Sequence, residues 1–199
     1  MRLRRLPLLL LLGMVAVGGG GAPVTAAPHA KAAAAVVMQG MTFLPARVHV
    51  GLGEHVTWTN QDGFTHTVTS DQKFWDSGLV PAGTTFDRAF AVAGTFAYHC
   101  KIHSTMHGKV AVPLVASGSP SAGWRLTWAA GALPARRTVD VRVRREGTTT
   151  WHAFRSGTTA LGGRFDPARP GTWQVRAHET NTRSGASSGW SPVLSLAVS

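Results

Sequence analysis

Apolar and polar residues alternate with a period of two along most of this chain. Between residues 46 and 59, charged, histidine and threonine side chains interleave with the apolar set Ala46, Val48, Val50, Val56 and Trp58. Such alternation is typical of strands that bury one face. Residues 64–69 continue it, with His66 between Phe64 and Val68 on the face expected to point inward. No segment has the period of an amphipathic helix, so the pattern predicts an all-β chain.

The second half of the chain repeats the alternation with its own apolar residues. It appears in "TVDVRVRREG" at residues 138–147, in "GTWQVRAHE" at 171–179 and in "VLSLAVS" at 193–199. Between the two halves stands "PLVASGSPSAG", whose Pro, Ser and Gly content is typical of a linker. We therefore predict two successive β-sandwiches, at residues 36–114 and 122–199, joined by a linker at 115–121.

The first 35 residues differ in composition from the rest. "MRLRRLPLLLLLGMVAVGGGGAPVTAA" has a basic start, an apolar run and a small-residue end, the pattern of a secretory signal peptide. We assign residues 1–26 to this signal and 27–35 to an alanine-rich leader, and expect a secreted, periplasmic or cell-surface protein with no stable transmembrane span after cleavage. The alternative is an uncleaved anchor, but a span needs roughly 20 apolar residues and Gly18 to Gly21 interrupt this run.

Charge divides the chain at the same boundary. Residues 32–112 carry equal numbers of basic and acidic side chains, whereas residues 119–199 carry eleven arginines, no lysine and four acids. In "VRVRR" the arginines alternate with valines, as on the solvated face of a strand, or on a surface that contacts an anionic cell-surface polymer or an acidic protein. Export and the lack of interleaved aromatic and basic residues argue against nucleic acid.

Candidate chemistry gathers in "FAYHCKIHSTMHGKVAV", residues 96–112. Cys100 is the single cysteine, so it forms no internal disulfide. It ends a predicted strand on the inward face, and a short loop brings His103 and Met106 back towards it, while the inward-facing His66 is the available fourth ligand. Two imidazoles, a thiolate and a thioether suit copper, whereas structural zinc sites seldom use methionine. His107, beside Met106, is the alternative axial ligand.

Two motifs give the first half a family resemblance. "FLPARVHVGLGEHVTWTNQDGFTHTV" and the C-x₂-H-x₂-M loop in "YHCKIHSTM" resemble the cupredoxins of the plastocyanin and amicyanin group. The resemblance implies a Greek-key sandwich that holds one type 1 (blue) copper ion through His66, Cys100, His103 and Met106. Thr67 stands where several members have an asparagine that ties the ligand loops together.

The second half has a looser resemblance. With "WRLTW" at residues 124–128 and "SGWSP" at 188–192, it resembles a fibronectin type III domain, and Trp173 stands where that family usually has a tyrosine. Such a fold does not by itself define a function, so this sandwich is interpreted as an adhesion or interaction module.

Four classes of function remain for the whole chain. The leading hypothesis is an exported electron carrier that cycles between Cu(I) and Cu(II) and docks a redox partner protein near His103, with Ile102 and Thr105 in the docking surface. The alternatives are a copper-binding or delivery protein, an adhesive protein with a relic site, and an enzyme. Catalysis is not expected, because copper oxidases and nitrite reductases need further histidine-rich centres and the second half has only His152 and His178.

Overall fold

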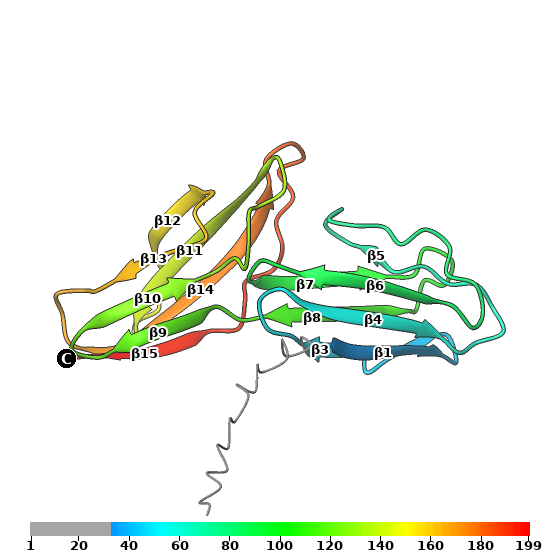
Figure 1. Cartoon of the computed structure of the whole chain (residues 1–199), viewed down its shortest axis with the longest axis horizontal. Helices are drawn as coiled ribbons and strands as arrows, with labels where there is room; N and C mark the ends of the chain where they lie inside the picture. The colour runs from blue at the N-terminus through cyan, green and yellow to red at the C-terminus, as the bar shows by residue number, and fades with distance from the viewer. Residues whose placement is uncertain (1–32) are drawn as a thin grey trace, which may run out of the picture. The chain divides into compact units, whose positions relative to one another are not determined.

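The computed structural model describes residues 33–199. All the regular secondary structure in that range is β-strand. This confirms the predicted all-β class (Figure 1). The described residues include no helix that is long and apolar enough to cross a membrane. The predicted signal peptide at residues 1–26 and residues 27–32 of the predicted leader lie outside the described residues.

The first half contains two four-stranded sheets. One has the strand order β2-β1-β4-β6 and the other β3-β8-β7-β5. Their strands are β1 (Ala33–Gln39), β2 (Thr42–Leu44), β3 (Arg47–His49), β4 (Glu54–Asn60), β5 (Thr69–Ser70), β6 (Thr85–Phe90), β7 (Gly94–His99) and β8 (His107–Val112). β1 pairs with β4 in parallel, and β3 pairs with β8 in parallel. These crossed connections are those of a sandwich and not of a simple meander.

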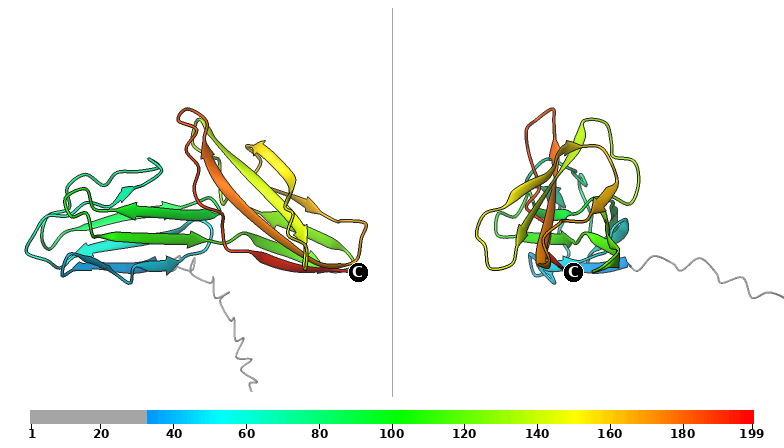
Figure 2. Two further views of the ribbon diagram at one scale, coloured as in Figure 1. Left: turned by 180° about the vertical axis from the view of Figure 1, so that it is seen from behind. Right: turned by 90° about the vertical axis from the view of Figure 1, so that its left-hand side faces the viewer.

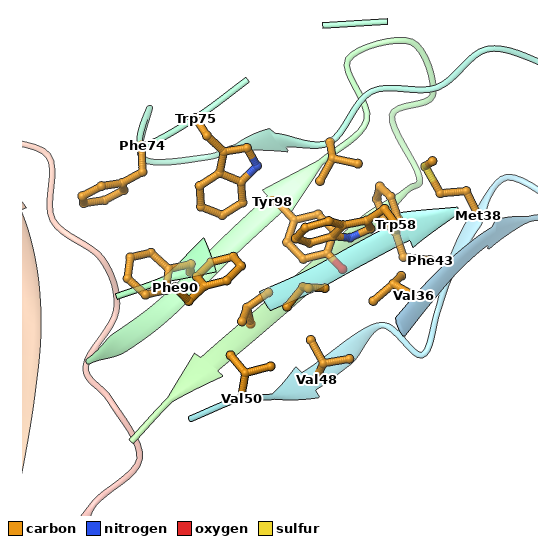
Figure 3. Packing of buried hydrophobic residues seen from close by; sticks show 14 of the residues in the cluster. Val36, Met38, Phe43, Val48, Val50, Trp58, Phe74, Trp75, Phe90 and Tyr98 are labelled. Carbon is orange, nitrogen blue, oxygen red and sulfur yellow. The ribbon is translucent and has the colours of Figure 1, made fainter. Parts of the chain in front are cut away.

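Aromatic residues form the centre of the core between these sheets. Tyr98 of β7 makes edge-on contacts with Trp58 of β4, at a centroid distance of 5.4 Å, and with Phe43 of β2, at 4.8 Å (Figure 3). All three side chains are at most 1% exposed. Tyr98 lies opposite Gly108 of β8, where a Cβ atom would stand only 2.3 Å from the tyrosine ring. The phenol therefore occupies the space that any other residue at position 108 would need.

The predicted alternation holds in most of these strands, but two residues predicted to face inward are exposed. Val48, Val50, Val56 and Trp58 are buried as predicted. Ala46 is exposed, because it lies in a bend before β3 begins. Phe64 is 63% exposed.

The expected strand over residues 64–69 is reduced to β5 and one isolated bridge between His66 and Val80. Thr67 is buried as well as its neighbours His66 and Val68, so this segment does not alternate. The Thr67 hydroxyl accepts a hydrogen bond of 2.9 Å from the Lys101 N–H, and the Thr69 hydroxyl donates one of 3.1 Å to Asp76.

The boundary of the leader also differs from the prediction. Residues 33–35, assigned to the alanine-rich leader, form the start of β1 and pair with residues 55–57 of β4. The run of alanines predicted an unstructured leader. Strand pairing, however, uses backbone N–H and C=O groups, and every residue except proline has both.

The second half consists of a three-stranded and a four-stranded sheet. Their strand orders are β13-β10-β9 and β12-β11-β14-β15 (Figure 2). The strands are β9 (Val115–Ser119), β10 (Gly123–Thr127), β11 (Arg137–Arg145), β12 (His152–Thr158), β13 (Gly162–Phe165), β14 (Gly171–Asn181) and β15 (Leu194–Val198). Most residues predicted to face inward on β11 and β14 are buried, namely Val139, Val141, Val143, Val175 and Ala177, whereas Trp173 is only half-buried.

The prediction that residues 115–121 form a linker is wrong, because most of them form a strand. Residues 115–119 are β9, which pairs along its whole length with β10. Its serines and glycine suggested a loop, but they can form a strand because pairing depends on backbone groups and not on side-chain hydrophobicity. Leu114 belongs to the core of the second half, together with Val92 and Ala93 from the connection between β6 and β7. The second core therefore begins before the boundary that composition indicates.

Candidate metal centre

His66 is held on the inner side of the segment that follows β4. Its backbone exchanges two hydrogen bonds with Val80, of 3.1 and 2.8 Å, and its side chain is fully buried. The turn before it is fixed by Asn60, whose buried amide donates to the carbonyls of Phe64 and Val80 at 2.7 and 2.9 Å. The sequence prediction that His66 points inward is confirmed.

The loop between β7 and β8 supplies the other predicted site residues. The Cys100 N–H donates to the carbonyl of Met106, and the Met106 N–H donates to that of His103, each at 3.1 Å. These two bonds curl residues 100–106 into a closed loop. Cys100 and Met106 are at most 1% exposed, and His103 is half-buried.

Three ligand atoms converge at this place. His66 Nδ1 lies 3.0 Å from His103 Nδ1, and the Cys100 Sγ lies 3.9 and 3.7 Å from those two nitrogens. All three atoms are within 4.8 Å of one another. Ligands bound to one ion at about 2.0 Å for nitrogen and 2.3 Å for sulfur have separations of this size. The donor set therefore fits a single metal ion with no change of fold.

Hydrogen bonds also favour the charged form of the thiol. Burial raises the pKa of Cys100, but hydrogen bonds from the Thr67 N–H at 3.3 Å and from the backbone of the following loop outweigh it. Together they lower the pKa from 9.0 to about 6. The thiolate, which is the form that binds metals, is therefore the main form at neutral pH.

Thr67 connects the two ligand segments. Its N–H donates to Cys100 Sγ, and its hydroxyl accepts a hydrogen bond of 2.9 Å from the Lys101 N–H. Thr67 thus joins the segment of His66 to the loop of His103 by two bonds.

The remaining histidines of the first half point elsewhere. His99 bonds to Asp71 at 2.6 Å on the opposite face of β7, and His55 bonds to Asp87 at 2.6 Å. His107 is exposed, and its Nε2 lies 2.9 Å from the Ser104 carbonyl. These contacts hold the side chains of His99 and His55 away from the site.

One residue beside the site, Asp62, is not among the residues predicted from the sequence. Asp62 appears in the sequence only as part of a turn, yet its carboxylate accepts a hydrogen bond of 2.9 Å from His66 Nε2. Hydrogen bonding by the Met41 backbone is the main cause that lowers the pKa of Asp62. The signal available in the sequence was an acidic residue four positions before a predicted ligand, which by itself is too common to be specific.

Comparison with known proteins identifies the first half. The model of the cupredoxin-like domain family matches residues 8–112, which is more than half of the chain. The chain belongs to the cupredoxin-like family. Amicyanin of Paracoccus denitrificans is 30% identical over 95 residues, a match that covers 45% of this chain and 72% of the amicyanin.

Other cupredoxins match over the same part of the chain. Plastocyanin of Scenedesmus fuscus is 32% identical over 85 residues, covering 36% of this chain and 87% of the plastocyanin. For the chloroplastic plastocyanin of Tetradesmus obliquus, at 33% identity, the match spans 59% of that protein. A solved structure of a mutant amicyanin in its Cu(I) form matches with 28% identity and a TM-score of 0.39, covering 40% of this chain and 81% of the amicyanin. The family match ends at residue 112, so the fibronectin type III-like character of the second half stays a prediction.

Proposed function

We propose that the chain carries single electrons at a type 1 copper centre whose ligands are His66, Cys100, His103 and Met106. The observation that supports this most strongly is the convergence of two imidazole Nδ1 atoms and an acidic thiol within 4.8 Å. One copper ion per chain would supply the redox chemistry, by alternating between Cu(I) and Cu(II).

The donor set favours copper over zinc. Structural zinc sites use four cysteine or histidine ligands, whereas among residues 33–199 only three such groups gather at one place. Met106 is fully buried in the loop that carries Cys100 and His103. A thioether is a soft ligand that suits copper, so Met106 is the proposed axial ligand.

The protein's own contribution is a fixed set of ligands. Backbone hydrogen bonds hold Cys100 to Met106, and Thr67 ties the His66 segment to the same loop. Ligands that are fixed in this way change position little between two oxidation states, which favours rapid electron transfer. Because Cys100 is largely ionised at neutral pH, little proton release accompanies copper binding at this sulfur.

His103 is the proposed route for electrons, because it is the least buried of the three converging ligands. Its neighbour Ile102 is 49% exposed, while Phe64 and Leu79, on either side of the His66–Val80 bridge, are 63% and 70% exposed. A contiguous patch of exposed apolar side chains marks a contact surface, and we propose that these three belong to one. We therefore place the docking surface for a redox partner protein around His103.

The spectrum of the Cu(II)-loaded protein tests this function. We expect a strong visible band from thiolate-to-copper charge transfer, which Cys100→Ser removes. A colourless Cu(II) complex of the native chain would contradict the proposed type 1 centre. Met106→Leu should retain copper and raise the reduction potential, because losing the thioether disfavours Cu(II) more than Cu(I). His107→Ala is the matched control and should leave both spectrum and potential unchanged.

A copper-delivery protein is the alternative that the same preparation tests. An electron carrier should hold Cu(I) against a competing chelator and reduce or oxidise a small-molecule mediator over many cycles. Rapid loss of copper to the chelator, without sustained redox cycling, would favour delivery. The signal-like residues 1–26 support a place outside the cytoplasm for either role.

The second half offers a basic surface for an anionic partner. Arg176 stacks between Trp151 and Trp190, with its guanidinium carbon 4.0 and 4.4 Å from the two ring centroids. Arg144 stacks on Trp151 at 4.5 Å, and Arg142 lies 5.4 Å from Trp190. In the part of the chain that the structure describes, the arginines with carboxylate partners are Arg137 and Arg164, so these three have none. Unpaired guanidiniums held in a row favour a polyanion.

Immobilised heparin is a suitable probe of this surface. The double variant Arg142→Gln/Arg144→Gln should elute at lower salt than the native chain, because exposed charges act through a screened interaction. The control Arg155→Gln/Arg164→Gln removes two arginines elsewhere in the same half. Equal elution of both variants would mean that overall charge, and not the stacked row, determines binding.

A further inference from the structure

Asp62 contacts the metal centre from the outer side of His66. Its Oδ2 lies 2.9 Å from His66 Nε2, the ring nitrogen that faces away from Cys100 and His103. The His66 side chain is fully buried and that of Asp62 is 12% exposed. The pair therefore lies in a protected position, where a hydrogen bond to a charged group is stronger than at the surface.

A strained turn holds the Asp62 carboxylate in place. The Gly40 N–H donates to Oδ1 at 2.7 Å, and the Met41 N–H donates to Oδ2 at 3.0 Å. Both residues have left-handed backbone angles, with φ of 61° and 55°. A non-glycine residue such as Met41 adopts this conformation at a cost, which persists only where the surroundings fix it. The turn between β1 and β2 is thus built around the carboxylate.

This geometry determines which nitrogen of His66 carries the proton. An ionised carboxylate accepts hydrogen bonds but donates none, so His66 Nε2 must be the N–H donor. In the neutral ring the lone pair is then on Nδ1, which lies 3.0 Å from His103 Nδ1. Metal-binding histidines commonly have their second nitrogen fixed by a carboxylate in this way.

The charge of Asp62 acts in addition to its position. Of the carboxylates that the structure describes, Asp62 is the one hydrogen-bonded to a proposed copper ligand. A negative charge one imidazole ring away stabilises the more highly charged oxidised ion more than the reduced ion.

We propose that Asp62 is a positioning residue for the metal centre: it fixes the ring and tautomer of His66 and favours the oxidised state of the bound ion. The tautomer part concerns the protein alone, whereas the preference for the oxidised state rests on the proposed copper function. The experiment therefore has one arm without metal and one with copper.

The first arm measures histidine nitrogen chemical shifts of the metal-free protein by NMR. In the native chain the neutral ring of His66 should be protonated at Nε2. Asp62→Asn should give a mixture of tautomers, because an amide can donate as well as accept. Asp87→Asn is the matched control, since Asp87 accepts from His55 at 2.6 Å far from the site and should not alter His66. A native His66 protonated at Nδ1 would overturn the proposal, even if the Asn variant failed to fold.

The second arm compares the copper-loaded proteins. Loss of such a carboxylate partner typically lowers metal affinity about 10–100-fold. We expect Asp62→Asn to lower the affinity for Cu(II) by at least tenfold more than that for Cu(I), which raises the one-electron potential by about 59 mV. Asp87→Asn should leave the potential at the native value. An unchanged potential in Asp62→Asn would overturn the claim about charge, while absence of a blue band in the native protein would instead count against the proposed function.

Discussion

Lowering the pH from 9 to 6 should destabilise the metal-free protein through the side chain of Cys100. Its pKa is lowered from 9.0 to about 6 in the folded state, while the unfolded thiol keeps the ordinary value. Between these pH values the unfolded state binds a proton that the folded state does not bind, so stability increases with pH. At about 1.4 kcal/mol for each pH unit, the free energy of unfolding should fall by on the order of 4 kcal/mol from pH 9 to pH 6. Below pH 6 this thiol should contribute no further change.

Urea unfolding of the reduced protein in the presence of a chelator measures this effect. The comparison is between the native chain and Cys100→Ser at each pH, because carboxylates and histidines titrate in both proteins. Packing differences between sulfur and oxygen add an offset that does not vary with pH. The difference in the free energy of unfolding should therefore grow from pH 6 to pH 9, and thiolate absorbance of the folded native chain should appear near pH 6.

A pH-independent difference would refute this reasoning. Together with thiolate absorbance that appears only near pH 9, it would mean that the penalty of burial cancels the hydrogen bonds from Thr67 and the loop. Copper binding would then have to displace the thiol proton at neutral pH, and loading would slow as the pH falls.

Three further outcomes follow from the packing of the first half. Gly108→Ala should lower the free energy of unfolding by about 1–3 kcal/mol, because its Cβ would stand 2.3 Å from Tyr98, whereas Gly131→Ala, which has open space, should be nearly neutral in the same urea titration. Burial raises the pKa of Tyr98 to about 12, so stability should fall as the pH rises from 10 towards 12, and Tyr98→Phe should abolish this alkaline loss. Asn60→Ala leaves the Phe64 carbonyl unpaired, whereas the Val80 carbonyl keeps its bond from the His66 N–H, so the variant should cost about 1–3 kcal/mol, with weaker copper binding in a chelator competition.

Alternation predicted the strands well where one face is buried and the other solvated. Val56 and Trp58 in β4, and Val139, Val141 and Val143 in β11, are buried as the period of two requires. Alternation did not predict β9, because its serines and glycine give no apolar pattern even though their backbone is fully paired.

The candidate site was predictable for a different reason. Cys100 and His103 are separated by a loop too short to keep them apart, so spacing alone brings them together. The inward direction of His66 was predicted because it lies two residues before the apolar Val68. Asp62 was not predictable, because its role depends on the turn at Gly40 and Met41, more than twenty residues away in sequence. No local sequence pattern indicates the contact between this turn and the Asp62 carboxylate.

The place of Leu114 in the core of the second half bears on how the whole chain melts. This residue follows β8 directly, yet its side chain is buried in the second core with Val92 and Ala93. Unfolding of either half would strip apolar contacts from the other, so the chain should melt as one cooperative unit. A ligand that binds only the folded state raises the melting temperature of everything that unfolds with its site. Copper bound in the first half should therefore protect the second half, as reported by the fluorescence of the buried Trp128, from thermal denaturation.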